Sequence, residues 1–115
     1  MERFLLKSKI HGAHVTEANL DYEGSLTVDA TLLEAANIIG YERVVIWNLT
    51  NGARIETYAI KGRPGSGVIC ANGAAAHHVK KGDKIIIATF ASYPSNETKN
   101  HKPIKIFVDS ENHIK

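Results

Sequence analysis

The sequence is poor in several features that would assign it to a class of protein. Its single cysteine, Cys70, excludes an intramolecular disulfide and a cysteine-based zinc cluster. No apolar run approaches the roughly 18 residues of a membrane span, and Met1-Glu2-Arg3 leads into mixed polarity rather than a signal-peptide core. Its 14 basic and 12 acidic residues give a net charge of only +2, and aromatic residues make up only 7%. This balance argues against a nucleic-acid-binding surface. We therefore expect a small, soluble, cytoplasmic protein with no metal site and no nucleic-acid or membrane partner.

Most of the chain carries the pattern of β-strands, in a length of 115 residues that suits one domain, residues 1–115. The segment 4–11 alternates in polarity, and 43–49 and 84–90 are rich in β-branched and aromatic residues, as strands are. Shorter strands are predicted over 68–70 and 104–108. Asn51-Gly52 separates 43–49 from 53–60, which predicts a hairpin closed by a type I′ turn.

Two short helices are predicted between these strands. The first would begin with Asp29 or Thr31 as its cap, and Thr31 with Glu34 matches a capping box. Gly40 would end it, and the apolar face would comprise Leu32, Leu33, Ala36 and Ile39. The second helix would follow Asn72 and run through residues 73–78. Six or so strands with two small helices predict a mainly β fold, a compact barrel.

One dipeptide is a candidate for chemistry within the chain itself. Gly24 tolerates backbone angles closed to other residues, and the Oγ atom of Ser25 lies next to the Gly24 carbonyl carbon along the chain. A strained turn with a donor near the carbonyl oxygen would favour an intramolecular acyl shift. By itself, however, Gly-Ser is also the composition of an ordinary turn, like Gly65-Ser66.

Five blocks of sequence in one order place this dipeptide in a wider pattern. They are Lys9-Ile10-His11, Tyr22-Glu23-Gly24-Ser25, Trp47-Asn48-Leu49-Thr50-Asn51-Gly52-Ala53-Arg54, Thr57-Tyr58 and Asn72-Gly73-Ala74-Ala75-Ala76. Together they resemble the pyruvoyl-dependent aspartate 1-decarboxylase family, over residues 3 to 108. The resemblance implies a six-stranded double-psi β-barrel with two or three short helices, assembled as a homotetramer. The chain departs from the family at Leu26, where many relatives have cysteine, and at Ile55, where phenylalanine is expected.

The resemblance further implies a lyase that is made as a proenzyme. Cleavage between Gly24 and Ser25 would give a β chain, 1–24, and an α chain, 25–115, with a pyruvoyl group derived from Ser25. This group would form a Schiff base with L-aspartate, which loses its α-carboxylate as CO2 to give β-alanine for the biosynthesis of pantothenate and coenzyme A.

Roles for individual residues also follow from the resemblance. Thr57 matches the self-processing position, where its hydroxyl would donate to the developing oxyanion, and Tyr58 is the expected proton donor in turnover. The residues expected to bind substrate are Lys9, Arg54, Thr57, Asn72, Gly73, Ala74 and Ala75, and secondary positions are His11 and Tyr22. The active sites would lie where two subunits meet, so an isolated protomer would be inactive.

Two other interpretations stay open at this point. A β-barrel of this size also suits a non-catalytic binding module, and a related decarboxylase could act on another acidic amino acid such as glutamate. The sequence also leaves open whether cleavage is spontaneous or needs a maturation factor.

Overall fold

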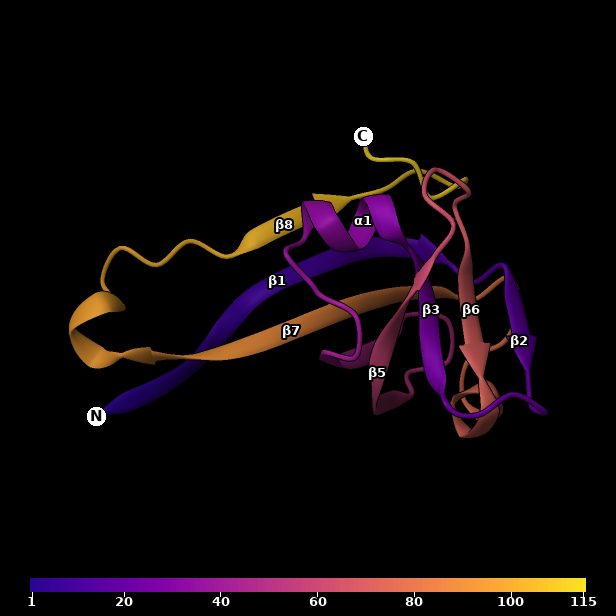
Figure 1. Cartoon of the computed structure of the whole chain (residues 1–115), viewed down its shortest axis with the longest axis horizontal. Coiled ribbons are helices and arrows are strands. Elements are labelled where there is room, and N and C mark those ends of the chain that lie inside the picture. Colours follow the sequence, from indigo (N-terminus) through magenta and orange to yellow (C-terminus); the bar gives the residue numbers. More distant parts are fainter.

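The structure, a computed structural model, describes all 115 residues and is dominated by β-strands (Figure 1). In chain order the elements are β1 (Glu2–His14), β2 (Glu17–Asn19), β3 (Ser25–Asp29), α1 (Ala30–Ala35), β4 (Arg43–Asn48), β5 (Arg54–Gly62), β6 (Ile69–Asn72), the 3-10 helix η1 (Gly73–His77), β7 (Lys84–Pro94), the 3-10 helix η2 (Ser95–Glu97) and β8 (Ile104–Phe107).

The strands form one eight-stranded sheet in the order β2-β6-β3-β5-β4-β7-β1-β8. The mainly β fold predicted from the sequence is confirmed. The short strands β2 and β8 occupy the two ends of this order, so six strands lie between them. Neighbours pair antiparallel except for β2–β6, β3–β5 and β1–β8, which are parallel. Parallel neighbours need crossover connections, so β3 and β5 meet only after the chain has passed through α1 and β4.

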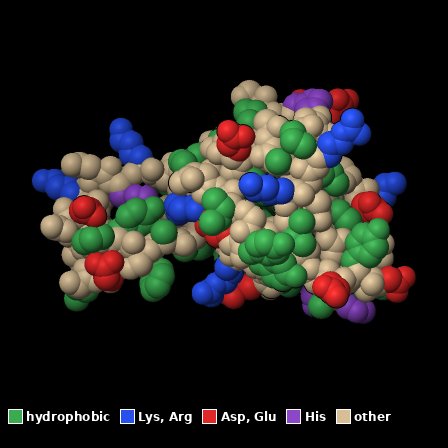
Figure 2. Space-filling model, viewed as in Figure 1, with side chains coloured by type: hydrophobic (Ala, Val, Ile, Leu, Met, Phe, Trp, Pro, Cys, Tyr) green, Lys and Arg blue, Asp and Glu red, His purple; other side chains and the backbone are tan.

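The two longest strands extend beyond the rest of the sheet. β1 and β7 pair from Glu2↔Pro94 to His14↔Lys84, and their outer halves form an arm that carries the N-terminus (Figure 1). Figure 2 shows this arm as the narrower lobe, with acidic and basic side chains interspersed over the visible face. Register shifts after Leu6 and His11 interrupt the β1–β7 ladder. Such irregularities bend and twist a strand, as β1 must where it passes from the arm to the body.

The core lies on the inner face of the sheet. Ile10 and Ile46 flank Ile87 in register, and all three are fully buried within a cluster of 19 residues. Alternate residues of the same strands, such as Lys9 and Trp47, point to the outer face. Neither α1 nor the two 3-10 helices has the length and apolar character that crossing a membrane requires.

The first helix is capped by Asp29, one of the two predicted caps; the alternative cap at Thr31, with its capping box, is wrong, and the helix ends earlier than predicted. Asp29 Oδ1 accepts the N–H of Thr31 at 2.8 Å and that of Gly65 at 2.9 Å, and Oδ2 accepts that of Gly67 at 2.9 Å. Burial alone would raise the pKa of Asp29, but these backbone donors outweigh it and hold the pKa below its ordinary value.

The ends of the helix and of the hairpin correct the sequence prediction. The helix stops at Ala35, followed by Asn37 at φ 55°, so the predicted stop at Gly40 is wrong. Ile39 lies beyond the helix and is exposed. The hairpin of β4 and β5 exists, but of the predicted turn pair only Gly52 has a positive φ, so the turn is not type I′. Instead the side chain of Asn48 accepts backbone N–H groups inside a wider loop.

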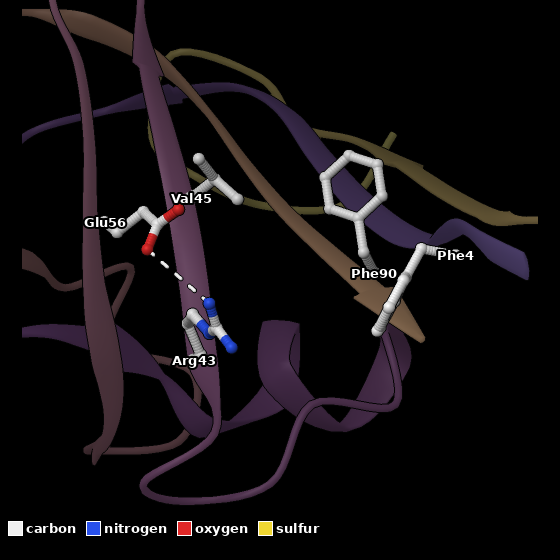
Figure 3. A pocket seen from close by; sticks show the side chains of 5 residues that line it. All are labelled: Phe4, Arg43, Val45, Glu56 and Phe90. Atoms are coloured by element: carbon white, nitrogen blue, oxygen red, sulfur yellow. Dashed lines mark ion pairs between the residues drawn. The ribbon is translucent and has the colours of Figure 1, made fainter. Parts of the chain in front are cut away.

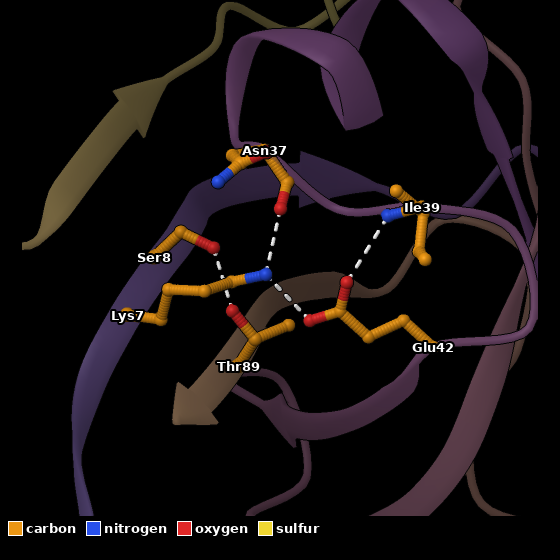
Figure 4. Close-up of polar contacts among 6 residues, drawn as sticks. All are labelled: Lys7, Ser8, Asn37, Ile39, Glu42 and Thr89. Atoms are coloured by element: carbon orange, nitrogen blue, oxygen red, sulfur yellow. Dashed lines mark hydrogen bonds and ion pairs between the residues drawn. The ribbon is translucent and has the colours of Figure 1, made fainter. Parts of the chain in front are cut away.

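A polar cluster joins β1 to the segment between α1 and β4 (Figure 4). Lys7 Nζ donates to the Asn37 carbonyl and pairs with the Glu42 carboxylate, both at 2.6 Å. Beside it, the hydroxyls of Ser8 and Thr89 share a buried hydrogen bond of 2.6 Å between β1 and β7. Because Lys7 and Glu42 are only partly exposed, this pair is less screened by solvent than a surface ion pair.

Candidate active site

Ser25 occupies a strained and fully buried position. It is the first residue of β3, paired with Asn72 on β6, and its exposed fraction is 0%. Its φ of 125° lies in a region that residues with a side chain rarely adopt. Strain of this kind persists only where surrounding contacts hold it, and it concentrates at functional sites.

A cavity of about 220 Å³ opens onto Ser25. Drug-sized ligands occupy pockets of about 300–1,000 Å³, so this cavity suits a molecule about the size of an amino acid. Its lining residues are Gly24, Ser25, Ile55, Glu56, Thr57, Ala74, Ala75 and His78. Of the two departures noted in the sequence, Ile55 thus reaches the cavity, whereas Leu26 is fully buried in the core.

The carbonyl that precedes Ser25 is held by a side chain from β5. Tyr58 Oη donates to the Gly24 carbonyl oxygen at 3.2 Å, and the Tyr58 ring lies 6.3 Å from that of Tyr41. A donor at this oxygen polarises the carbonyl and favours attack on its carbon. Thr57, which the resemblance implies as the donor, lines the same cavity, but the hydroxyl in contact with the carbonyl is that of Tyr58.

The amide of Asn72 contacts the hydroxyl of Ser25 from the neighbouring strand. Its Nδ2 donates to Ser25 Oγ at 3.2 Å and to Thr27 Oγ1 at 3.0 Å, and its Oδ1 accepts from Cys70 Sγ at 3.1 Å. Asn72 therefore contacts the hydroxyl of Ser25 directly.

Gly73 makes room for the chain segment before Ser25. Its φ is +60°, and a Cβ at this position would lie 2.6 Å from the Tyr22 carbonyl oxygen and 2.9 Å from the backbone nitrogen of Gly24. The space beside Gly73 is thus filled by residues 22–24, the segment that precedes Ser25. Tyr22 touches this position through its backbone, and its side chain is exposed.

The predicted cationic residues do not line the Ser25 cavity of their own chain. Four residues on neighbouring strands lie in one row across the outer face of the sheet. In order across the strands they are His11, Ile86, Trp47 and Arg54. The guanidinium of Arg54 lies 5.0 Å from the centre of the Trp47 ring, within range of a cation–π contact. Lys9 lies one side-chain row away, opposite Ala88. None of these residues lines the Ser25 cavity.

The electrostatic environment of this outer row is positive. Burial lowers the pKa of His11, and the charges of Lys9, Lys84 and Lys115 lower it further. His11 therefore favours its neutral form, while the lysines supply the positive charge. Such a surface suits an anionic group brought to it from outside the chain.

Several residues at the site had no assigned role from the sequence. Glu56 and His78 line the cavity, and no local pattern marked either of them. Glu56 pairs with Arg43 at 3.6 Å, and both also line a neighbouring groove in which Phe4 and Phe90 lie across from the pair (Figure 3). Cys70 could have been found from its position two residues before Asn72 in a strand, which puts both side chains on one face.

Comparison with known proteins identifies the family of this chain. The family model described as Aspartate decarboxylase matches residues 1–115. A protein of Myxococcus xanthus named Aspartate 1-decarboxylase is 57% identical over 99% of this chain and 88% of its own length. Proteins of the same name from Syntrophobacter fumaroxidans and Syntrophus aciditrophicus are 56% and 54% identical, over 97% and 100% of this chain and 90% and 99% of their own. The family has the double-psi β-barrel fold. The chain belongs to the aspartate decarboxylase family.

Proposed function

We propose that this chain is the proenzyme of an aspartate 1-decarboxylase, which cleaves itself between Gly24 and Ser25 and then converts L-aspartate to β-alanine and CO2. The observation that carries the proposal is the arrangement at this bond. Ser25 is buried at φ 125°, its neighbouring carbonyl accepts a hydrogen bond from Tyr58, and both residues of the bond line a cavity.

The cleavage uses atoms of the chain itself. Ser25 Oγ attacks the Gly24 carbonyl carbon, and the hydroxyl proton passes to the amide nitrogen, so that the C–N bond is replaced by an ester. Loss of the Ser25 α-proton then breaks the bond between Cβ and the ester oxygen. Residues 1–24 leave with a carboxylate at Gly24, and the dehydroalanine at position 25 takes up water and loses ammonia. The product is a pyruvoyl group at the start of residues 25–115. Relief of the strain at Ser25 favours the first step.

Once formed, the group supplies an electrophilic ketone that serves as an electron sink for decarboxylation. Around it, the chain offers Asn72 Nδ2 as a hydrogen-bond donor and the Tyr58 hydroxyl as a proton donor to the substrate carbon. Thr57, Ala74 and Ala75 line the cavity that would receive the substrate.

Charge recognition needs a second copy of the chain in this proposal. Aspartate carries two carboxylates, and the cations expected to bind them, Lys9 and Arg54, lie on the outer face of the sheet and not in the cavity of their own chain. We propose that the outer face of one subunit closes the cavity of its neighbour, with Arg54 as a bidentate carboxylate ligand, within a homotetramer. The product β-alanine would serve pantothenate synthesis.

The first experiment is the mass of the purified protein under denaturing conditions. We expect two fragments, 1–24 and 25–115, the larger one with the mass of a pyruvoyl-started rather than a serine-started chain, and CO2 release from L-aspartate. Ser25→Ala should remain whole and release none. Comparable rates on L-glutamate would overturn the assignment to aspartate. A chain that stays whole on prolonged warming and with cell extract added, and releases no CO2, would instead support a binding module.

A single variant, Tyr58→Phe, distinguishes the part that Tyr58 plays in self-cleavage from its part in decarboxylation. Tyr58→Phe removes one oxygen and keeps the ring, so the fold should be unchanged. Because its bond to Gly24 is long, we expect cleavage to slow by no more than about tenfold. Its CO2 release should fall by at least about 10²-fold, as for loss of a general acid. Wild-type turnover by this variant would exclude Tyr58 as the proton donor. Cleavage that occurs only when cell extract is present would show that a maturation factor is required.

A further inference from the structure

Cys70 lies directly behind the amide that contacts Ser25. Cys70 and Asn72 are two residues apart in β6, so their side chains point to the same face. Both are buried, with exposed fractions of 5% and 4%, and the distance from Cys70 Sγ to Asn72 Oδ1 is 3.1 Å. The thiol is the third partner of an amide whose other two partners are hydroxyls.

Only the thiol distinguishes the two ends of this amide. The hydroxyls of Ser25 and Thr27 can each donate or accept a hydrogen bond, so they satisfy either the NH2 group or the oxygen of Asn72. A thiol is a weak donor and a weak acceptor, and in this structure it donates, from Cys70 Sγ to Asn72 Oδ1 at 3.1 Å. It therefore favours the orientation in which Oδ1 faces Cys70 and Nδ2 faces Ser25.

The surroundings keep the thiol in its donating form. Burial raises the pKa of Cys70, and the carboxylate of Glu17 on the adjacent strand β2 raises it further. A protonated thiol retains the S–H group that the contact with Asn72 requires.

We propose that Cys70 is a positioning residue for the chemistry at Ser25, whose thiol fixes the amide of Asn72 with its NH2 group toward the serine oxygen. This inference rests on the proposed self-cleavage. With Nδ2 facing Oγ, the amide stabilises negative charge that develops on Oγ as its proton leaves. With the amide turned over, Oδ1 would instead hold the hydroxyl proton and oppose its transfer to the amide nitrogen.

The test is the rate of cleavage of newly made chains, synthesised in a cell-free system and sampled by mass spectrometry. Cys70→Val is close in volume but has no donor, and Cys70→Ala is the second donor-free variant in case valine does not fit. A neutral hydrogen bond contributes about 0.5–1.5 kcal/mol, so we expect cleavage to slow by about threefold to tenfold. Cys70→Ser places a hydroxyl that satisfies either end of the amide, so it should also slow cleavage, but by less than Cys70→Val, because Asn72 keeps a hydrogen-bond partner in both orientations.

Repeating the Cys70 substitution in the Asn72→Ala variant distinguishes a positioning role of Cys70 from general damage to the fold. In Asn72→Ala the thiol has no amide to orient, so adding Cys70→Val should produce no further slowing. An equal slowing in both backgrounds, or Cys70→Val at the wild-type rate with its Tm unchanged, would overturn the proposal. If the wild-type chain itself does not cleave with or without cell extract, the proposed function fails, and the inference about Cys70 fails with it.

Discussion

Replacing Gly73 with alanine should disable self-cleavage while leaving the barrel intact. The residue has φ +60°, where an added Cβ costs roughly 1–2 kcal/mol. The Cβ would also lie 2.6 Å from the Tyr22 carbonyl oxygen, so the backbone of residues 22–24 must withdraw by about 0.8 Å to restore a contact of 3.4 Å. Misplacing reacting atoms by about 1 Å can cost 10²-fold in rate. We therefore expect cleavage at Gly24-Ser25 to slow by about two orders of magnitude.

The assay is a time course of intact and cleaved mass, with Tm measured on the same samples. Gly52→Ala is the matched control, because Gly52 has φ +80° but nothing within 4 Å of the added Cβ. It should lose about as much stability from backbone strain and cleave at the wild-type rate. If Gly73→Ala cleaves as fast as the control, the close approach of residues 22–24 to η1 does not hold the reacting bond in place, and this reasoning is wrong.

Two further predictions concern single carboxylates. Asp29→Ala leaves three backbone N–H groups without their acceptor and should lower the free energy of unfolding by about 2–4 kcal/mol. Because folding lowers the pKa of Asp29, this stabilisation is complete above its ordinary value of 3.8 and is lost as pH falls through the folded value, so the Tm of variant and wild type should converge in acid. Glu56→Gln removes negative charge from the cavity and leaves Arg43 in place, so the KM for L-aspartate should fall by about twofold to fivefold at low salt and change less at high salt. An unchanged KM would show that Arg43 already neutralises this charge.

The local elements of the fold could be predicted because their causes lie within a few residues. Alternation identified the strand around residues 4–11, β-branched and aromatic residues identified the strand around 84–90, and a short polar side chain identified the cap at Asp29. The end of the helix and the type of hairpin turn were wrong for a related reason. The helix ends through Asn37 at positive φ and not at Gly40, and Asn51 lacks the positive φ that a type I′ turn requires, in a loop where the side chain of Asn48 accepts backbone N–H groups.

The candidate site also has features that the sequence determines and features that depend on the tertiary structure. The sequence by itself determined which residues could react, because a glycine carbonyl and a serine hydroxyl adjacent in the chain are adjacent in any fold. Only the tertiary structure decided that Ser25 is buried at an unfavourable φ, that Tyr58 and Asn72 reach this bond, and that Arg54 does not line the cavity beside it. Tyr58 is 34 residues from Gly24, and Asn72 is 47 from Ser25. Contacts over such separations depend on the order of strands in the sheet, with β3 between β5 and β6, and that order comes from packing the whole core and from no local pattern.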